Sequence, residues 1–366
     1  MKKQFLSFVF LFIFASFYPL FSQSNFNSNY VKSLREATIC FENKDYGKAL
    51  ILAENAIREK KEQHTKEVEK LERTLASREV RKAGDDLSKV LKALYERDEN
   101  DIANIIEFYI SKKGKTFFNN SVKSMIEYIK TLKEYPEAKK LIGDIYKIEG
   151  EFTLAQDFYL QALEYSDVLN VNDEKYTILY LLADISRLLA DDNSYETRLL
   201  NIASTQSLEK RNILVNSMSS LIKKDKKDTI NKFFDMYRFD DYYSLNAYCQ
   251  LAEFYKEKAL YDKALGFSAL AVITGFSKMD YVISKRDLTY EYKDLASFLE
   301  DVSNHYDLVE WADQNNIWKS FDLLCEISNL CGSTVFSSDL LKVLARYCPS
   351  EYWRNSAVIK LDSVKN

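Results

Sequence analysis

One pattern of seven residues occurs three times in this chain with the same intervals, and it strongly restricts the fold. The clearest copy consists of Gly143, Tyr146, Gly150, Phe152, Ala155, Tyr159 and Ala162. The second consists of Ala252, Tyr255, Ala259, Tyr261, Ala264, Ser268 and Ala271. The third consists of Ala37, Cys40, Lys44, Tyr46, Ala49, Ala53 and Ala56. Small and aromatic residues stand at helical spacing on both sides of a short interruption, so each copy predicts two antiparallel helices joined by a tight turn.

The residue types at these positions explain how the two helices would pack. Gly143 lets the first helix approach its partner closely, and Tyr146 fills the groove one turn later. Gly150 can adopt the left-handed conformation that ends a helix. Ala155 and Ala162 lie on one face of the second helix and allow tight packing there. Each copy is therefore a helix hairpin that must stack on a neighbour to bury its apolar face.

This pattern resembles the tetratricopeptide repeat (TPR) family. Ile142-Gly143 and Leu251-Ala252 match the Leu-Gly step of that family. The family's early Trp and terminal Pro are replaced in the clearest copy by Lys139 and Asp167. The resemblance implies an all-α fold. The expected architecture is an α-solenoid, wound as a right-handed superhelix of antiparallel helix pairs, with a helical C-terminal cap.

The first residues predict export. Met1-Lys2-Lys3 is positively charged, residues 5–14 are almost wholly apolar, and Ser22 offers a small residue for cleavage. That order is typical of a secretory signal peptide, which we assign to residues 1–22. The apolar run is shorter than the roughly 20 residues of a membrane span, and retention as an anchor is the alternative. We therefore expect an exported, bacterial-type protein of the periplasm or cell envelope.

Residues 23–275 are expected to form the repeats and residues 276–366 a helical cap. Clear units lie near residues 30–57, 137–165 and 246–274. Degenerate units should fill the gaps, and in one of them Ser186 takes the place of Gly143 and Asn193 that of the turn. Further helices are predicted at Asp86–Leu94, Asp101–Ile110, Val122–Leu132, Leu208–Ile222 and Thr229–Phe239.

Two segments depart from the repeat spacing. Residues 58–83 are crowded with charge but keep a narrow apolar stripe at Val68, Leu71 and Leu75. This stripe predicts a long helix that projects from the first repeat with limited coiled-coil character, and a solvated helix without a partner is the alternative. Residues 276–366 keep a helical period without the repeat spacing. We expect them to cap the last apolar face of the solenoid, with a separate ligand-binding role as the alternative.

Charge and cysteine content exclude some classes of partner and scaffold. The formal net charge of -4 provides no electrostatic footprint for nucleic acid. No later segment predicts a membrane span, so membrane association is expected to be peripheral at most. Five scattered cysteines do not form a dense disulfide framework. We interpret them as small buried residues, with one bridge among Cys325, Cys331 and Cys348 as the alternative.

The sequence offers little for catalysis. Its two histidines are His64 and His305, and neither has acid–base partners at a suggestive spacing. It contains neither paired zinc ligands at short spacing nor a glycine-rich phosphate loop. We therefore predict a protein that is not an enzyme and that needs no metal or cofactor.

The resemblance to TPR proteins also implies where a protein partner would bind. In that family the first helices of the repeats line the concave side. The side chains at the matching positions are Lys140, Asp144, Lys147, Arg187, Cys249, Glu253 and Lys256, together with Ala183 and Ala190. We expect a scaffold or adaptor whose groove holds a partner segment, and homo-oligomerisation stays open. The alternatives are a ligand-presenting accessory subunit of an envelope transport system and a helical enzyme that uses carboxylates.

Overall fold

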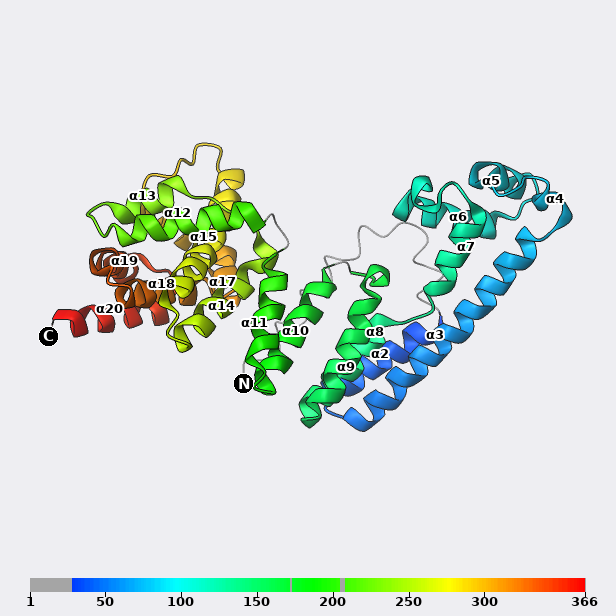
Figure 1. The fold of residues 1–366 in the computed structure, drawn as a ribbon, viewed down its shortest axis with the longest axis horizontal. Coiled ribbons are helices and arrows are strands. Elements are labelled where there is room, and N and C mark those ends of the chain that lie inside the picture. Colours follow the sequence, from blue (N-terminus) through cyan, green and yellow to red (C-terminus); the bar gives the residue numbers. More distant parts are fainter. Residues whose placement is uncertain (1–27, 172, 205–207, 366) are drawn as a thin grey trace. The chain divides into compact units, whose positions relative to one another are not determined.

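The computed structural model describes residues 28–171, 173–204 and 208–365, and the regular elements within these ranges are helices. The chain is all-α, as predicted, and its helices pack in neighbouring pairs (Figure 1). The expected signal peptide at residues 1–22 lies outside the described residues. The chain divides into two compact units, one up to Ile178 and one from Leu179 on. Among the described helices, none is both long and apolar enough to cross a membrane.

Most helices of the first unit are short, and one is much longer than the rest. In chain order they are α2 (Asn29–Glu42), α3 (Tyr46–Leu75), α4 (Arg78–Arg81), α5 (Leu87–Tyr95), α6 (Asn100–Lys113), η2 (Lys115–Phe118), α7 (Val122–Thr131), α8 (Pro136–Glu149), α9 (Phe152–Glu164), η3 (Ser166–Val168) and the start of α10 (Glu174–Leu188).

The second unit takes up the rest of α10 and continues to the end of the described chain. Its further helices are α11 (Asp192–Ile202), α12 (Leu208–Lys223), α13 (Thr229–Met236), η4 (Tyr242–Ser244), α14 (Leu245–Glu257), α15 (Tyr261–Arg286), α16 (Leu295–Ser303), α17 (Tyr306–Gln314), α18 (Ile317–Leu330), α19 (Thr334–Tyr347) and α20 (Glu351–Lys365).

Within each unit the helix pairs pack on one another as in a solenoid. In the first unit α2 pairs with α3, α8 pairs with α9, and α3 packs along α8. In the second unit α14 pairs with α15, α18 pairs with α19, and α15 packs against α18. The residues of the repeated pattern form these contacts: Ala155, Tyr159 and Ala162 of α9, for example, are fully buried.

A left-handed residue ends the first helix of each clear repeat. Lys44, Gly150 and Ala259 have φ angles of 64°, 84° and 55°. In all three turns the next residue donates its amide N–H to the carbonyl five positions before it, at 2.8 to 2.9 Å. This bond satisfies a carbonyl that the helix end would otherwise leave without a partner. The turn expected from Gly150 is therefore the same in all three repeats.

Among the described α-helices, the same turn joins three more consecutive pairs. Asp98, Ala190 and Gly332 have φ angles of 58°, 55° and 81°. The corresponding N–H···O bonds measure 2.8 to 3.0 Å. The turn joins α5 to α6, α10 to α11 and α18 to α19, so it marks hairpins whose repeat spacing is not evident in the sequence.

The turn at Ala190 corrects the predicted register of the degenerate repeat. Ala183, and not Ser186, takes the place of Gly143, because each lies seven residues before its turn. Ala183 is fully buried, as that place requires. The prediction was wrong because Asn193 was assigned to the turn, whereas it lies inside α11.

The turn at Gly332 shows that residues 276–366 retain one hairpin of the repeat type, which corrects the expected loss of spacing. Cys325 and Ser337 occupy the two places where the clearest repeat has small residues facing each other. The Ser337 hydroxyl donates to the carbonyl of Cys325 at 2.7 Å. The sequence does not indicate this hairpin, because Cys and Ser stand where the other repeats have Gly or Ala. All five cysteines are free.

The predicted helix over residues 58–83 is wrong in its extent and in its surroundings. α3 ends at Leu75, and the chain turns back through α4, which buries Val80. The stripe residues Val68 and Leu71 pack with α5, α6 and α7, which gather at this end of α3 (Figure 1). The stripe is therefore neither a coiled-coil seam nor a solvated face, because it belongs to a small helical core.

The remaining predicted helices agree with the structure more closely. Asp86–Leu94, Asp101–Ile110, Val122–Leu132 and Leu208–Ile222 correspond to α5, α6, α7 and α12. The helix predicted at Thr229–Phe239 ends earlier, at Met236, because Tyr237 is extended. The Phe239 amide then donates to the Ser277 hydroxyl at 2.9 Å, which anchors the segment that follows.

Candidate functional site

The structure places three of the residues predicted to contact a partner on α8 of the first unit. Lys140 Nζ forms an ion pair with Asp144 Oδ2 at 2.8 Å. The Tyr159 hydroxyl donates to the other oxygen of Asp144 at 2.8 Å. Lys147 is half-buried in the last turn of the helix. Asp144 is thus already engaged within its own hairpin.

The other four predicted residues lie in the second unit, where three of them belong to a row of ion pairs between first helices. Arg187 of α10 pairs with Glu257 of α14 at 3.1 Å. From α14, Glu253 pairs with Lys319 of α18 at 2.6 Å, and Lys256 pairs with Glu326 of α18 at 3.1 Å. These side chains connect neighbouring hairpins of the solenoid.

Two details of the predicted groove are corrected. Cys249 was expected to face the groove but is only 5% exposed, because α14 turns that side chain into the core. The corrected register places Ala183 in the core and Ala190 in the turn. Arg187 then corresponds to Lys147 and Lys256, since each lies three residues before a left-handed residue.

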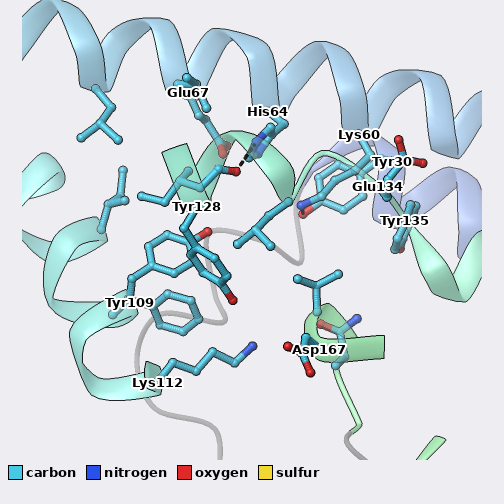
Figure 2. Close-up of a pocket in the computed structure, with 18 of the residues that line it drawn as sticks. Tyr30, Lys60, His64, Glu67, Tyr109, Lys112, Tyr128, Glu134, Tyr135 and Asp167 are labelled. Carbon is cyan, nitrogen blue, oxygen red and sulfur yellow. Dashed lines mark hydrogen bonds between the residues drawn. The ribbon is translucent and has the colours of Figure 1, made fainter. Parts of the chain in front are cut away.

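A pocket in the first unit brings together residues that the sequence analysis did not connect. It has a cavity volume of about 760 Å³ and is lined by residues of α2, α3, α6 and α7, by residues 132–137 at the start of α8, and by residues 167–170. Figure 2 shows Tyr109 and Tyr128 on one side of it and Tyr30 and Tyr135 on another, with α3 along its edge. Its residues come from segments far apart in the chain, so no local motif signalled it.

The first aromatic wall consists of two tyrosines from neighbouring helices. Tyr109 of α6 and Tyr128 of α7 meet edge to face, with 6.2 Å between ring centroids. Burial raises the pKa of Tyr109 to about 12. Its phenol therefore stays protonated at neutral pH and offers both a ring face and a hydrogen bond.

The second aromatic wall forms a corner. Tyr30 and Tyr135 pack at 89° with ring centroids 5.3 Å apart, and both are 5% exposed. Lys60 of α3 extends over this corner, with its Nζ 4.6 Å from the Tyr30 ring centroid. The same ammonium donates to the Tyr30 hydroxyl at 3.4 Å. Burial raises the pKa of Tyr135 well above its usual value.

His64 lines the pocket but has a structural partner. Its Nε2 lies 3.0 Å from the carbonyl oxygen of Ile129, which ties α3 to α7. A carbonyl only accepts, so Nε2 carries the proton of the neutral ring. Burial lowers the pKa of His64, and the nearby Lys60 lowers it further. His64 is 7% exposed, so this side of α3 is not the solvated face given as the alternative for residues 58–83.

Most charges around the pocket are neutralised within its walls. Three acids have basic partners in the same unit: Lys70 pairs with Asp101 at 3.2 Å, Lys139 with Glu134 at 2.6 Å, and Lys113 with Asp167 at 3.1 Å. These three acids are therefore already compensated by lysines of the same unit.

Glu137 differs from these acids. Its carboxylate accepts the amide N–H of Asn170 at 2.8 Å, and it forms no ion pair among the described residues. Burial raises the pKa of the Glu137 carboxyl above its usual value, and Glu174 acts in the same direction. The carboxylate is therefore held at the pocket with less compensation than its neighbours.

The described residues contain no group of three or more His, Cys, Asp or Glu side chains that could hold a metal ion. The pocket thus combines ring faces, phenol hydroxyls, two carboxylates without an ion pair among the described residues, those of Glu67 and Glu137, and lysine ammonium groups. Such a set can bind an amphipathic group by stacking, hydrogen bonding and charge.

The comparisons with known proteins give one relative. No protein-family model matches the chain. A protein of Treponema pallidum (strain Nichols), described as an uncharacterized protein, is 28% identical to this chain over 327 residues. The similarity covers 88% of this chain and 87% of that protein. The similar region of 327 residues is longer than either compact unit of this chain, so it extends into both units.

Proposed function

We propose that this chain is a non-catalytic binding protein of the TPR type, exported to the bacterial cell envelope, that holds a segment of a protein partner in the pocket of its first unit. The pocket itself is the observation that carries the proposal. A cavity of about 760 Å³ lies within the range of about 300–1,000 Å³ typical of ligand sites. Its tyrosines are the residue type that contributes most contact area at low entropic cost in protein interfaces.

The geometry supports binding over catalysis. His64 is the only imidazole that lines the pocket, and it bonds to a backbone carbonyl of the wall. Of the lining acids, Asp101, Glu134 and Asp167 are paired with lysines, and Glu67 and Glu137 accept hydrogen bonds from the Gln63 side chain and the Asn170 amide. General acid–base work needs a group that reaches the substrate with a free proton position. We therefore assign the pocket a recognition role.

The volume and aromatic lining of the pocket also favour a second candidate, the presentation of a small molecule. In that case the chain would act as an accessory subunit of an envelope transport system. A small ligand would occupy the cavity alone, whereas a partner segment would enter it with only a few side chains. The two candidates are separated by what remains bound to the purified protein.

Site-specific photocrosslinking in cells tests the proposal. A photoreactive phenylalanine analogue would replace Phe108, which is 41% exposed and lines the pocket. The control position is Ile51, which is 60% exposed on α3 and lies outside the pocket lining. We expect a protein adduct from position 108 and none from position 51.

A variant that fills the pocket completes the experiment. Asn104→Trp should abolish the adduct at position 108, whereas Lys89→Trp, at an exposed position outside the pocket, should not. Circular dichroism would verify that both variants fold. Equal adducts at both positions, or an adduct that survives Asn104→Trp, would contradict the proposal. A ligand seen by native mass spectrometry and lost in Asn104→Trp, without protein adducts, would favour the second candidate.

A further inference from the structure

We infer that the corner formed by Tyr30, Tyr135 and Glu137 binds an alkylammonium group, such as the side chain of a lysine on the partner segment. This inference rests on the proposed function, because it takes the pocket as the binding site. It adds the chemical class of the group that binds there. Three observations support it: the packing of the two rings, the position of the Lys60 ammonium group, and the lack of an ion pair for the Glu137 carboxylate among the described residues.

The two rings form a receptor for a cation. They pack edge to face at 89° with centroids 5.3 Å apart, and the Tyr30 ring still presents a face to an ammonium group, since Lys60 Nζ lies 4.6 Å from its centroid. The face of an aromatic ring carries negative electrostatic potential and attracts cations within about 6 Å of the centroid. Desolvation strengthens this attraction, and both rings are buried except for 5% of their surface.

Lys60 shows that the corner accepts an ammonium group. Its Nζ lies 4.6 Å from the Tyr30 centroid and 3.4 Å from the Tyr30 hydroxyl oxygen. Lys60 is tethered to α3 and forms no ion pair among the described residues, so an incoming ammonium can displace it toward solvent. Lys60 therefore acts as an internal competitor for the corner.

Glu137 supplies the negative charge that a bound cation needs. The neighbouring acid Glu134 is already neutralised by Lys139 at 2.6 Å and by Lys61 at 3.4 Å. Glu137 has only the Asn170 amide as a close partner. The charged groups that act on it include Lys60 and Glu174, which oppose each other. A cation seated beside Tyr135 would compensate the Glu137 carboxylate.

The remaining charges of the pocket do not favour an anion at this corner. Glu137 lies two residues after Tyr135 in the chain, and an anion placed beside that ring would meet its carboxylate, which has no ion pair among the described residues. Lys112, the other lysine without an ion pair, lies over the Phe108 ring at 5.6 Å on α6. The corner therefore selects positive charge, while the Lys112 side of the pocket does not.

The test uses n-butylammonium, which reproduces the end of a lysine side chain, and n-butanol as its neutral counterpart. Binding would be followed by NMR through the ring signals of Tyr30 and Tyr135 in the full chain. Lys60→Met removes the competing charge and keeps most of the stem. We expect this variant to bind n-butylammonium about fivefold more tightly than the wild type, and n-butanol no better than before.

Two further variants make the test specific. Glu137→Gln should weaken n-butylammonium binding about fivefold, because the amide keeps the Asn170 contact but loses the charge. Lys112→Met is the matched control, since it removes a lysine from the same pocket away from the corner, and it should change binding little. Equal binding of n-butanol, or unchanged binding in Lys60→Met, would overturn the inference.

The outcomes separate this inference from the proposed function. If n-butylammonium binds as expected but position 108 yields no protein adduct, the cation site stands without a protein partner. If the adduct forms but Lys60→Met and Glu137→Gln leave n-butylammonium binding unchanged, the partner enters the pocket by other contacts.

Discussion

The ring of Tyr159 lies so close to Gly143 that a Cβ added to residue 143 would be 2.6 Å from its Cε1 atom. The ring cannot easily move aside, because it is fully buried and its hydroxyl is bonded to Asp144. We therefore expect Gly143→Ala to destabilise the first unit by about 1–3 kcal/mol, despite the higher helix propensity of alanine. Chemical denaturation followed by circular dichroism would measure this change.

Gly47 provides the matched control. It is also helical, but a Cβ there would meet no atom within 4 Å. Gly47→Ala should therefore stabilise the protein by about 0.5–1 kcal/mol through helix propensity alone. If both alanine variants gain stability, the close approach of Tyr159 is not what requires a glycine at position 143.

The shared turn predicts opposite effects at equivalent positions. Gly150 and Ala259 both adopt positive φ angles, of 84° and 55°. Gly150→Ala should cost about 1 kcal/mol, and Ala259→Gly should stabilise by up to about 1 kcal/mol, because only glycine adopts this conformation without strain. Thermal unfolding of the two variants measures both signs. Two changes of the same sign would be incompatible with equivalent turns.

The contact between His64 and Ile129 predicts a pH dependence of stability. The pKa of His64 is lowered from 6.5 by burial, so the unfolded chain takes up the proton first as the pH falls. The free energy of unfolding should therefore decrease as the pH drops below 6.5. In His64→Gln, which keeps a donor for the carbonyl, this part of the decrease should disappear. His64→Phe removes the donor and should cost about 1 kcal/mol at pH 7. An unchanged pH profile in His64→Gln would mean that another group titrates in that range.

For Glu137 we expect the opposite pH dependence of stability. Its folded pKa is raised above 4.5, so the folded state holds the proton more tightly than the unfolded chain does. Stability at this site is therefore highest at low pH and is lost as the pH rises through the raised pKa. We expect Glu137→Gln to have a higher melting temperature than the wild type at pH 7, with the advantage shrinking toward pH 4.5. A variant that is less stable at pH 7 would show that the carboxylate is well compensated in the fold.

The sequence predicted the hairpins well because their determinants are local. The positions of Gly143, Gly150 and Ala155 follow from helix geometry within one repeat, and the structure confirms the hairpins that they predict. The predicted register of the degenerate repeat was wrong because Asn193, a polar residue inside α11, was assigned to the turn. The actual turn residue is Ala190. The hairpin at Gly332 escaped prediction because its small residues are Cys and Ser.

The pocket could not be predicted from any single segment. Tyr30, Lys60, Tyr109 and Tyr135 become neighbours only when α2 and α3 pack against α6, α7 and the start of α8. The apolar stripe within residues 58–83 predicted a coiled-coil seam, with a solvated helix as the alternative, because the sequence does not show which helices pack against it. The partner-binding residues inferred from the TPR resemblance lie on first helices, whereas α3 and α6, which contribute most to the pocket, are both second helices of their hairpins.

The unequal lengths of α3 and α9 have a consequence for how such a pocket can arise. Both are second helices after the same left-handed turn, yet α3 has 30 residues and α9 has 13. The C-terminal part of α3 extends beyond the helices of its own hairpin and of the next clear repeat, and other helices cover it. The pocket lies where this cover is incomplete. A stack of similar hairpins can thus acquire a cavity when one helix is lengthened and additional helices cover only part of its exposed length.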